Sequence, residues 1–225
     1  ESHREARPFQ PQLDARIASY QLAGRMQLAA TDALDLSQET AETKAMYGIG
    51  QKTTDSYGRR CLIARRLIEA GVRMVTLSWG HWDTHSANFP VLRRLLPPFD
   101  AGLAGLVTDL YERGLDKTTA ICVWGEFGRT PKIGLDNLSG GVPGRNHWPA
   151  VGMALLIGGG MRMGQLIGET DEHCAVVKER PCDTQEVLAT MYHHIGLDPR
   201  TTQIIDPAGR PQYLIEHNEP IRELI

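Results

Sequence analysis

The chain has little of several features that mark whole classes of protein. Its 24 lysines and arginines and 27 aspartates and glutamates leave a formal charge of −3, so it lacks the basic surplus of a nucleic-acid-binding protein. Its longest uncharged apolar run, Val151–Met161, is 11 residues long, well short of the roughly 18 residues that a membrane-spanning helix needs. We therefore expect no nucleic acid among its partners and no membrane span.

Cysteines and several common catalytic motifs are also scarce or absent. The four cysteines fit no zinc-knuckle spacing, although Cys174 and Cys182 are close enough in sequence to pair across a loop, a question the sequence leaves open. The chain contains no Walker-type phosphate loop, no dinucleotide-binding glycine pattern and no G-x-S-x-G elbow. Nothing therefore points to these nucleotide-dependent or serine-hydrolase chemistries.

What is present is an ordinary globular composition, with 41% hydrophobic and 23% charged residues in 225. Helical and short apolar segments alternate, and Asp183 with Glu186 forms a capping box. This alternation predicts an α/β fold with a mainly parallel sheet, flanked by helices on both faces, after a helical lead-in at residues 1–55. The predicted helices cover residues 57–70, capped by Asp55 or Ser56, 103–113 and 184–195, and the predicted strands cover 72–79, 118–124 and 151–157.

Two loops that follow predicted strands carry candidate chemistry, because ligands of open α/β sheets bind at the carboxyl ends of strands. In the first loop, His81, Asp83 and His85 lie within five residues, a plausible set of metal ligands. The alternative is a solvated loop in which Asp83 accepts backbone hydrogen bonds. In the second loop, Glu126 is costly to bury unless it is paired or bound to metal. Arg129 fits either as its salt-bridge partner or as a clamp for a phosphate or sulfate oxygen.

A third loop, around Arg145 and His147, comes just before the third predicted strand. That position is the amino end of the strand, so the strand-end rule does not bring His147 to the other two loops. Either this strand runs antiparallel, or the long loop that starts at Lys132 reaches back over the sheet. Both alternatives stay open at the level of sequence.

These loops carry the motifs WDTH at Trp82–His85, GEFGRTP at Gly125–Pro131 and GRNHWP at Gly144–Pro149. In this order they closely resemble the bacterial domain-of-unknown-function family 1501, and the resemblance covers essentially the whole chain. That family is similar to the alkaline phosphatase and sulfatase superfamily. The resemblance implies an alkaline-phosphatase-like domain, of which residues 56–225 would be the C-terminal portion.

The resemblance also implies a metal site. Asp83, His85 and His147 would ligate one divalent metal, and Glu126 would replace an aspartate that ligates a second. Zinc is the first expectation, with manganese, calcium and magnesium as alternatives. Phe127 stands where the superfamily commonly has a further histidine ligand, which argues against the second metal. The expected substrate contacts are Arg129, Arg145 and His81, the last of which could also be an extra ligand.

The expected function is metal-dependent hydrolysis of phosphate or sulfate esters, of a small molecule or a polysaccharide, by the chain or by a larger domain that it completes. The nucleophile is unknown, because no Asp-strand-Ser/Thr arrangement precedes residue 56 and the sulfatase modification signature is absent. We do not expect Thr84 or Thr130 to take its place. The alternatives are a catalytically silent secreted or envelope protein that binds sulfated or phosphorylated polysaccharide, and a phosphomutase. Twin-arginine export signals in family members imply a periplasmic or extracellular location.

Overall fold

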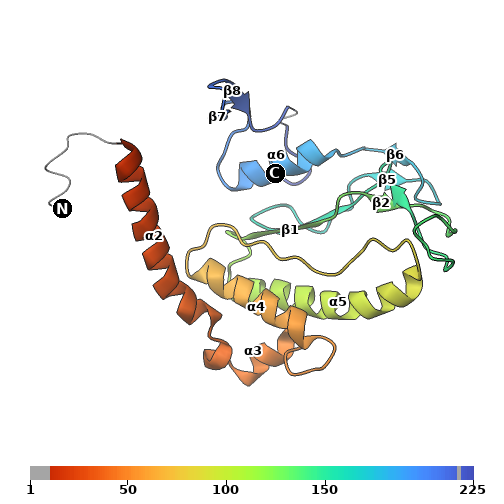
Figure 1. Ribbon diagram of the computed structural model, residues 1–225, viewed down its shortest axis with the longest axis horizontal. Coiled ribbons are helices and arrows are strands. Elements are labelled where there is room, and N and C mark those ends of the chain that lie inside the picture. The colour runs from red at the N-terminus through yellow and green to blue at the C-terminus, as the bar shows by residue number, and fades with distance from the viewer. Residues whose placement is uncertain (1–10, 217–218) are drawn as a thin grey trace, which may run out of the picture.

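A computed structural model of the chain describes residues 11–216 and 219–225 and shows a mixed α/β fold (Figure 1). Residues 1–10 of the predicted lead-in lie outside the described residues. Along the chain the elements are α2 (Pro11–Leu34), the 3-10 turn η1 (Leu36–Gln38), α3 (Ala41–Met46), α4 (Asp55–Glu69), α5 (Asn88–Glu112), β1 (Ala120–Trp124), β2 (Gly128–Arg129), β3 (His147–Trp148), β4 (Ala154–Gly158), β5 (Glu169–Thr170), β6 (Val177–Glu179), α6 (Thr184–His194), β7 (Gln203–Ile205) and β8 (Pro211–Tyr213).

The prediction of a mainly parallel sheet is wrong for the described part of the chain. The strands form four two-stranded sheets, β1–β4, β2–β3, β5–β6 and β7–β8, and each pair is antiparallel. The reason is visible in the connection between β1 and β4, which contains the short β2–β3 pair and loops but no helix. A parallel pair needs a long crossover, usually helical, whereas this chain turns back and pairs in the antiparallel sense.

The strand predicted at residues 72–79 is also absent. The segment forms no ladder and runs as a long irregular stretch beside α4 and α5 (Figure 1). Leu77 and Trp79 nevertheless pack against the main core cluster, and the guanidinium of Arg60 donates to the carbonyl of Ser78 at 3.1 Å. The apolar residues correctly indicated a partly buried segment, but packing on helices, not strand pairing, buries them.

Helices pack on both faces of the β1–β4 pair, although this pair is antiparallel and not the mainly parallel, alkaline-phosphatase-like sheet that was expected. Successive side chains of a strand point to opposite faces, and in β1 Ile121 packs toward α4 and α5, whereas Cys122 packs toward α6. Figure 1 shows α4 and α5 on one side of β1 and α6 on the other. The first core cluster contains Tyr47, Tyr57, Cys61, Leu62, Leu106 and Leu110, and the second contains Met161, Val187, Ile221 and Leu224.

The helix predicted at residues 103–113 begins earlier than expected, because α5 already starts at Asn88 and continues through Pro97 and Pro98. The ends of α4 and α6 follow the sequence closely, with one exception. The capping box of Asp183 and Glu186 is present at the start of α6. Gly71 lies just beyond α4 with φ of 88°, a left-handed conformation that favours glycine at a helix end. The exception is the cap of α4: Thr54, not Asp55 or Ser56, is its N-cap residue. Asp55 instead accepts a hydrogen bond from the backbone N–H of Gly50 at 2.7 Å.

The structure also bears on the lead-in, the membrane span and the cysteines. The described part of the lead-in contains α2, η1 and α3, and turns connect α3 to α4. Across the described residues, no helix combines the length and the apolar character that crossing a membrane requires. Cys174 and Cys182 are both exposed and unpaired.

Candidate metal centre

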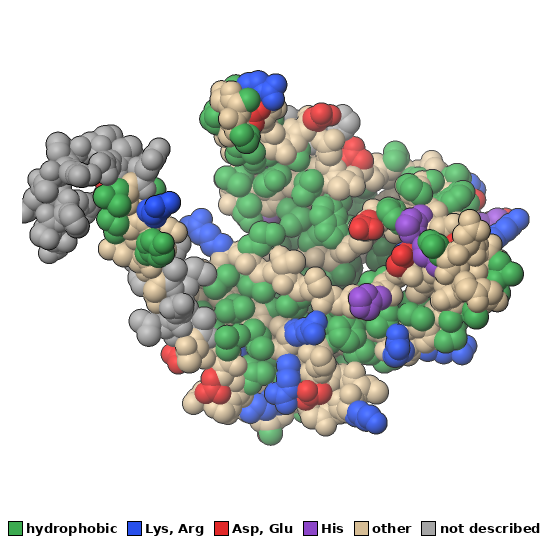
Figure 2. Space-filling model, viewed as in Figure 1, with side chains coloured by type: hydrophobic (Ala, Val, Ile, Leu, Met, Phe, Trp, Pro, Cys, Tyr) green, Lys and Arg blue, Asp and Glu red, His purple; other side chains and the backbone are tan. Residues whose placement is uncertain are grey.

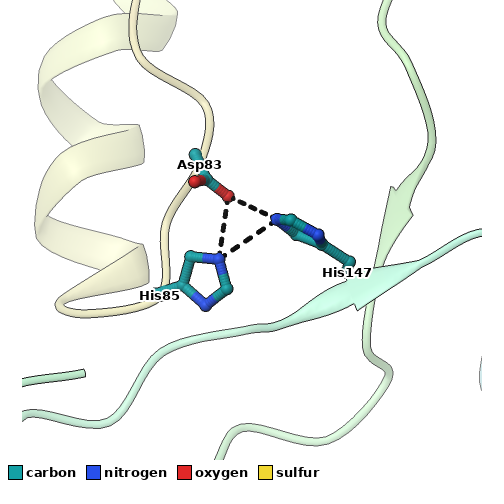
Figure 3. Close-up of side chains that lie close together, drawn as sticks. All are labelled: Asp83, His85 and His147. Atoms are coloured by element: carbon teal, nitrogen blue, oxygen red, sulfur yellow. Dashed lines mark hydrogen bonds and ion pairs between the residues drawn. The ribbon is translucent and has the colours of Figure 1, made fainter. Parts of the chain in front are cut away.

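Three of the predicted metal ligands lie together at one end of the molecule. Asp83 and His85 belong to the loop before α5, and His147 projects from β3 toward them (Figure 3). Asp83 Oδ1 lies 3.0 Å from His85 Nε2 and 2.9 Å from His147 Nε2, and the two imidazole Nε2 atoms are 3.1 Å apart. Figure 2 shows histidine side chains beside acidic ones at this end of the surface. One ligand atom from each of the three residues therefore points at the same small volume.

The antiparallel sheet explains how His147 reaches this site. In the β1–β4 pair, Trp124 at the end of one strand lies opposite Ala154 at the start of the other. The loop that leaves β1 and the loop that enters β4 therefore meet at the same edge. There β2 pairs with β3 and places Arg129 opposite His147. Of the two alternatives left open by the sequence, the antiparallel strand is the one the structure contains.

Backbone contacts hold the His147 loop against the Asp83 loop. The N–H of Arg145 donates to the carbonyl of Thr84 at 2.9 Å, and the N–H of Ala87 donates to the carbonyl of Pro143 at 3.1 Å. Gly144 lies between these bonds, where a Cβ atom would overlap the backbone of His85. Only glycine lets the two loops approach this closely.

The two threonines of the site are engaged in local hydrogen bonds. The buried Thr84 donates from Oγ1 to Asn88 Oδ1 at 2.6 Å. Thr130 donates to the carbonyl of Lys132 at 2.9 Å and accepts from the backbone N–H of Asn146 at 3.1 Å. The expectation that neither hydroxyl serves as a nucleophile stays a prediction.

Arg129 supplies the positive charge of the site. Its guanidinium lies 2.6 Å from Asp83 Oδ1, so the predicted oxyanion clamp pairs with a predicted metal ligand. The hydrogen bond from Arg129, followed by the bond with His147, lowers the pKa of the Asp83 carboxyl. The side chain of Asp83 is 61% exposed and that of His147 45%, whereas that of His85 is only 8% exposed. The site therefore combines one buried anchor with two ligands open to solvent.

Two further side chains of the site were missed by sequence reasoning. Asp136 Oδ2 lies 2.8 Å from His85 Nδ1, and the ring of Phe127 packs on the ring of His147 with centroids 4.6 Å apart. Asp136 begins a turn in the segment Asp136–Ser139, and the Asp-Asn-Leu-Ser sequence is typical of such turns. That signal predicts the turn, but it does not predict the contact with His85.

The remaining predicted residues are not drawn into this triad. Glu126 is exposed and is outside the group of ligand atoms that lie within 4.8 Å of one another, and His81 is exposed as well. Arg145 contributes its backbone to the loop contact, while its buried Nε has no hydrogen-bond partner among the described residues. The roles of Glu126, His81 and the Arg145 side chain stay predictions.

The donor set fits a transition metal. Two imidazole nitrogens and one carboxylate oxygen are a common protein contribution to a catalytic zinc site, which keeps one position open. Ligand atoms around a tetrahedral zinc lie about 3.3 Å apart, because each is about 2.0–2.1 Å from the ion. The three separations here, 2.9, 3.0 and 3.1 Å, are within a few tenths of an ångström of that value. The residues therefore need little rearrangement to hold such an ion.

Comparisons with known proteins identify one family. A family model described as "Protein of unknown function (DUF1501)" matches residues 1–225. Searches of curated proteins and of solved structures found no match.

Proposed function

Since the chain belongs to this family, DUF1501, whose description names no activity, we propose from the site itself that the protein is a metal-dependent hydrolase of phosphate or sulfate esters. The observation that carries the proposal is the convergence of Asp83, His85 and His147 beside the guanidinium of Arg129. The order of the motifs, which is similar to that of the alkaline phosphatase and sulfatase superfamily, supports the same class of substrate.

In this proposal Asp83 Oδ1, His85 Nε2 and His147 Nε2 hold one divalent ion, with zinc as the first candidate. Such an ion supplies Lewis acidity at an ester oxygen. The exposure of Asp83 and His147 leaves one side of the site accessible to a substrate. Phe127 holds the His147 ring in place through its packing contact.

Arg129 provides the anion specificity in this proposal. A planar guanidinium matches the oxygens of a phosphate or sulfate group and can bind two of them at once. In the structure it pairs with Asp83. When a metal ion binds Asp83 and offsets its charge, the guanidinium of Arg129 becomes available for the ester anion. Metal binding and substrate binding would therefore be linked through Arg129.

The first test is metal binding. Zinc content after purification and zinc titration by calorimetry should show one ion per chain, and His147→Ala should weaken binding at least 100-fold. His193→Ala is the matched control, because His193 is an exposed histidine of α6 outside the triad and its removal should leave binding unchanged. A wild-type chain that takes up no stoichiometric zinc, manganese, calcium or magnesium would contradict the proposal.

The second test is turnover. The zinc-loaded chain should release nitrophenol from an aryl phosphate or an aryl sulfate, and His147→Ala should lose this activity along with the metal. The engaged hydroxyls of Thr84 and Thr130 favour one alternative, a metal-containing protein that binds anionic polysaccharide without cleaving it. Stoichiometric metal and polysaccharide binding without turnover of either ester would establish that alternative.

The proposal also includes the location of the protein. The family resemblance implies that it acts outside the cytoplasm, on an ester of a small molecule or of a polysaccharide. Fractionation of cells that express the protein from its native gene should place it in the periplasm or the medium. Its recovery in the cytoplasmic fraction would contradict this part of the proposal.

A further inference from the structure

We propose that Asp136 is a positioning residue that fixes the tautomer and the ring orientation of His85, so that Nε2 is the atom presented to a metal. This inference rests on the proposed metal site and adds to it a residue outside the ligand triad. Asp136 Oδ2 lies 2.8 Å from His85 Nδ1, on the side of the ring opposite His147. The two side chains come from different loops, 51 residues apart in sequence.

The chemistry of the two groups assigns the proton. A neutral imidazole carries one N–H and one lone pair, and an ionised carboxylate can only accept a hydrogen bond. The contact with Asp136 therefore places an N–H of His85 at Nδ1, so that a neutral ring has its lone pair at Nε2. Nε2 is the atom that lies 3.0 Å from Asp83 Oδ1 and 3.1 Å from His147 Nε2. In a neutral ring the lone pair therefore points into the triad, whereas in a protonated ring Nε2 donates to Asp83 and Nδ1 still donates to Asp136.

The Asp136 carboxylate is itself held in place. Its Oδ1 accepts from the backbone N–H of Leu138 at 2.8 Å, which leaves Oδ2 for His85. Ser139 donates to the carbonyl of Asp136 from both its backbone N–H, at 3.2 Å, and its hydroxyl, at 2.9 Å. The carboxylate therefore cannot swing away without breaking its own turn.

The turn is also tied to the loop that carries His147. Gly134 and Gly144 exchange two backbone hydrogen bonds of 3.0 Å each. Gly144 in turn lies against the backbone of His85, close to the bond between Arg145 and Thr84. The three loops thus form one connected unit in which the 8% exposed His85 is held from both ring nitrogens. Carboxylate partners of this kind are typical of histidines that bind metals.

The direct test is the tautomer of His85 in the metal-free chain, read from long-range ¹H–¹⁵N correlations of the imidazole. The wild-type spectrum should show a proton on Nδ1, whether or not Nε2 also carries one. In Asp136→Asn the amide can donate to Nδ1, so the proton should move to Nε2. Asp206→Asn is the matched control, because Asp206 holds a similar turn at Ala208 and Arg210 between β7 and β8 and should leave the His85 signals unchanged.

Zinc affinity is the second readout. Asp136→Asn should weaken zinc binding roughly 10- to 100-fold, and Asp136→Glu, which keeps the carboxylate, should recover part of that loss. Ser139→Ala removes two hydrogen bonds of the turn, one to the carbonyl and one from the backbone N–H of Asp136, without touching the His85 contact. A loss as large as that of Asp136→Asn would therefore indicate a merely structural role. An unchanged His85 tautomer in Asp136→Asn would overturn the inference. If the wild-type chain bound no metal, the proposed function would fail, yet the tautomer measurement would still decide the role of Asp136.

Discussion

Two clusters of arginine, carboxylate and polar side chains differ in how far their charged groups are exposed to solvent. The first lies between α3, α4 and α5 and centres on Arg65, whose side chain is 1% exposed. The second is the metal centre, where Arg129 and Asp83 meet two histidines. Both contain short ion pairs, but the first is closed on itself and the second is open to solvent.

In the Arg65 cluster every charge has a fixed opposite charge. The three guanidinium nitrogens of Arg65 each bind a different carboxylate: Glu39 at 2.8 Å, Glu69 at 2.5 Å and Asp109 at 2.8 Å. The hydroxyl of the buried Tyr47 also donates to Asp109, at 2.8 Å. This arrangement ties the helices together and pairs the buried guanidinium of Arg65 with carboxylates on all three of its nitrogens.

The metal centre is instead open to solvent. Asp83 Oδ1 is shared by Arg129 and by both histidine Nε2 atoms, so one carboxylate oxygen meets three partners. The side chains of Asp83 and His147 are 61% and 45% exposed, so a cation from solvent can reach this position. The comparison shows that the number of ion pairs separates the two clusters less well than the exposure of their side chains.

The largest expected effect comes from breaking the buried cluster. Arg65→Met should reduce the free energy of unfolding by about 3 kcal/mol, because it removes the buried cation that three carboxylates share. Arg113 and Tyr47 still contact Asp109, and Arg66 still pairs with Glu39, so the loss should lie at the lower end of the range for breaking a buried ion pair. Urea denaturation measures this loss. Arg59→Met is the control, because Arg59 pairs with Asp55 on the surface and should cost less than about 1 kcal/mol. Equal losses in the two variants would show that burial does not distinguish these pairs.

A smaller effect is expected from acid. Burial raises the pKa of Asp109, but hydrogen bonds from Arg113 and Tyr47 and the charge of Arg65 outweigh it, so the net pKa is lowered. A carboxyl whose pKa is lower in the folded state stabilises the fold above its unfolded value, near pH 4, and loses that contribution as the pH falls through the folded value. Unfolding free energy measured from pH 7 down to pH 3 should therefore decrease, and by less in Arg65→Met. An equal decrease in both proteins would contradict this account.

The smallest expected effect on stability comes from the open cluster. Arg129→Ala should change the free energy of unfolding by less than about 1 kcal/mol, because its partner Asp83 is mostly exposed. Zinc should still bind, since the three ligands are retained, whereas inhibition or binding by inorganic phosphate should weaken roughly tenfold or more. A large loss of stability with unchanged phosphate binding would assign Arg129 to the fold and not to the site.

Much of the local structure could be predicted from the sequence. The capping box of Asp183 and Glu186, the glycine stops and the strands around Cys122 and Leu156 are all present, because each depends on a few neighbouring residues. The direction of strand pairing was predicted wrongly, because short continuous apolar runs are typical of parallel strands, whereas here they lie in an antiparallel pair with helices on both faces. The prediction of a strand at residues 72–79 was wrong because an apolar segment can be buried without pairing. Here Leu77 and Trp79 pack against the core cluster that α4 and α5 form.

The candidate site was likewise only partly predictable from the sequence. The sequence by itself determined the donor types, Asp83 and His85 on one loop, the basic Arg129 on the next and His147 on the third, because imidazole, carboxylate and guanidinium chemistry belongs to each residue wherever it lies. Only the tertiary structure decided that His147 joins the first two, that Glu126 stays outside the triad and that Asp136 stands behind His85. The contacts of His85 with His147 and with Asp136 join loops that are 62 and 51 residues apart in sequence. They depend on the antiparallel pairing of β1 with β4 and on the close approach of two loops that Gly144 permits.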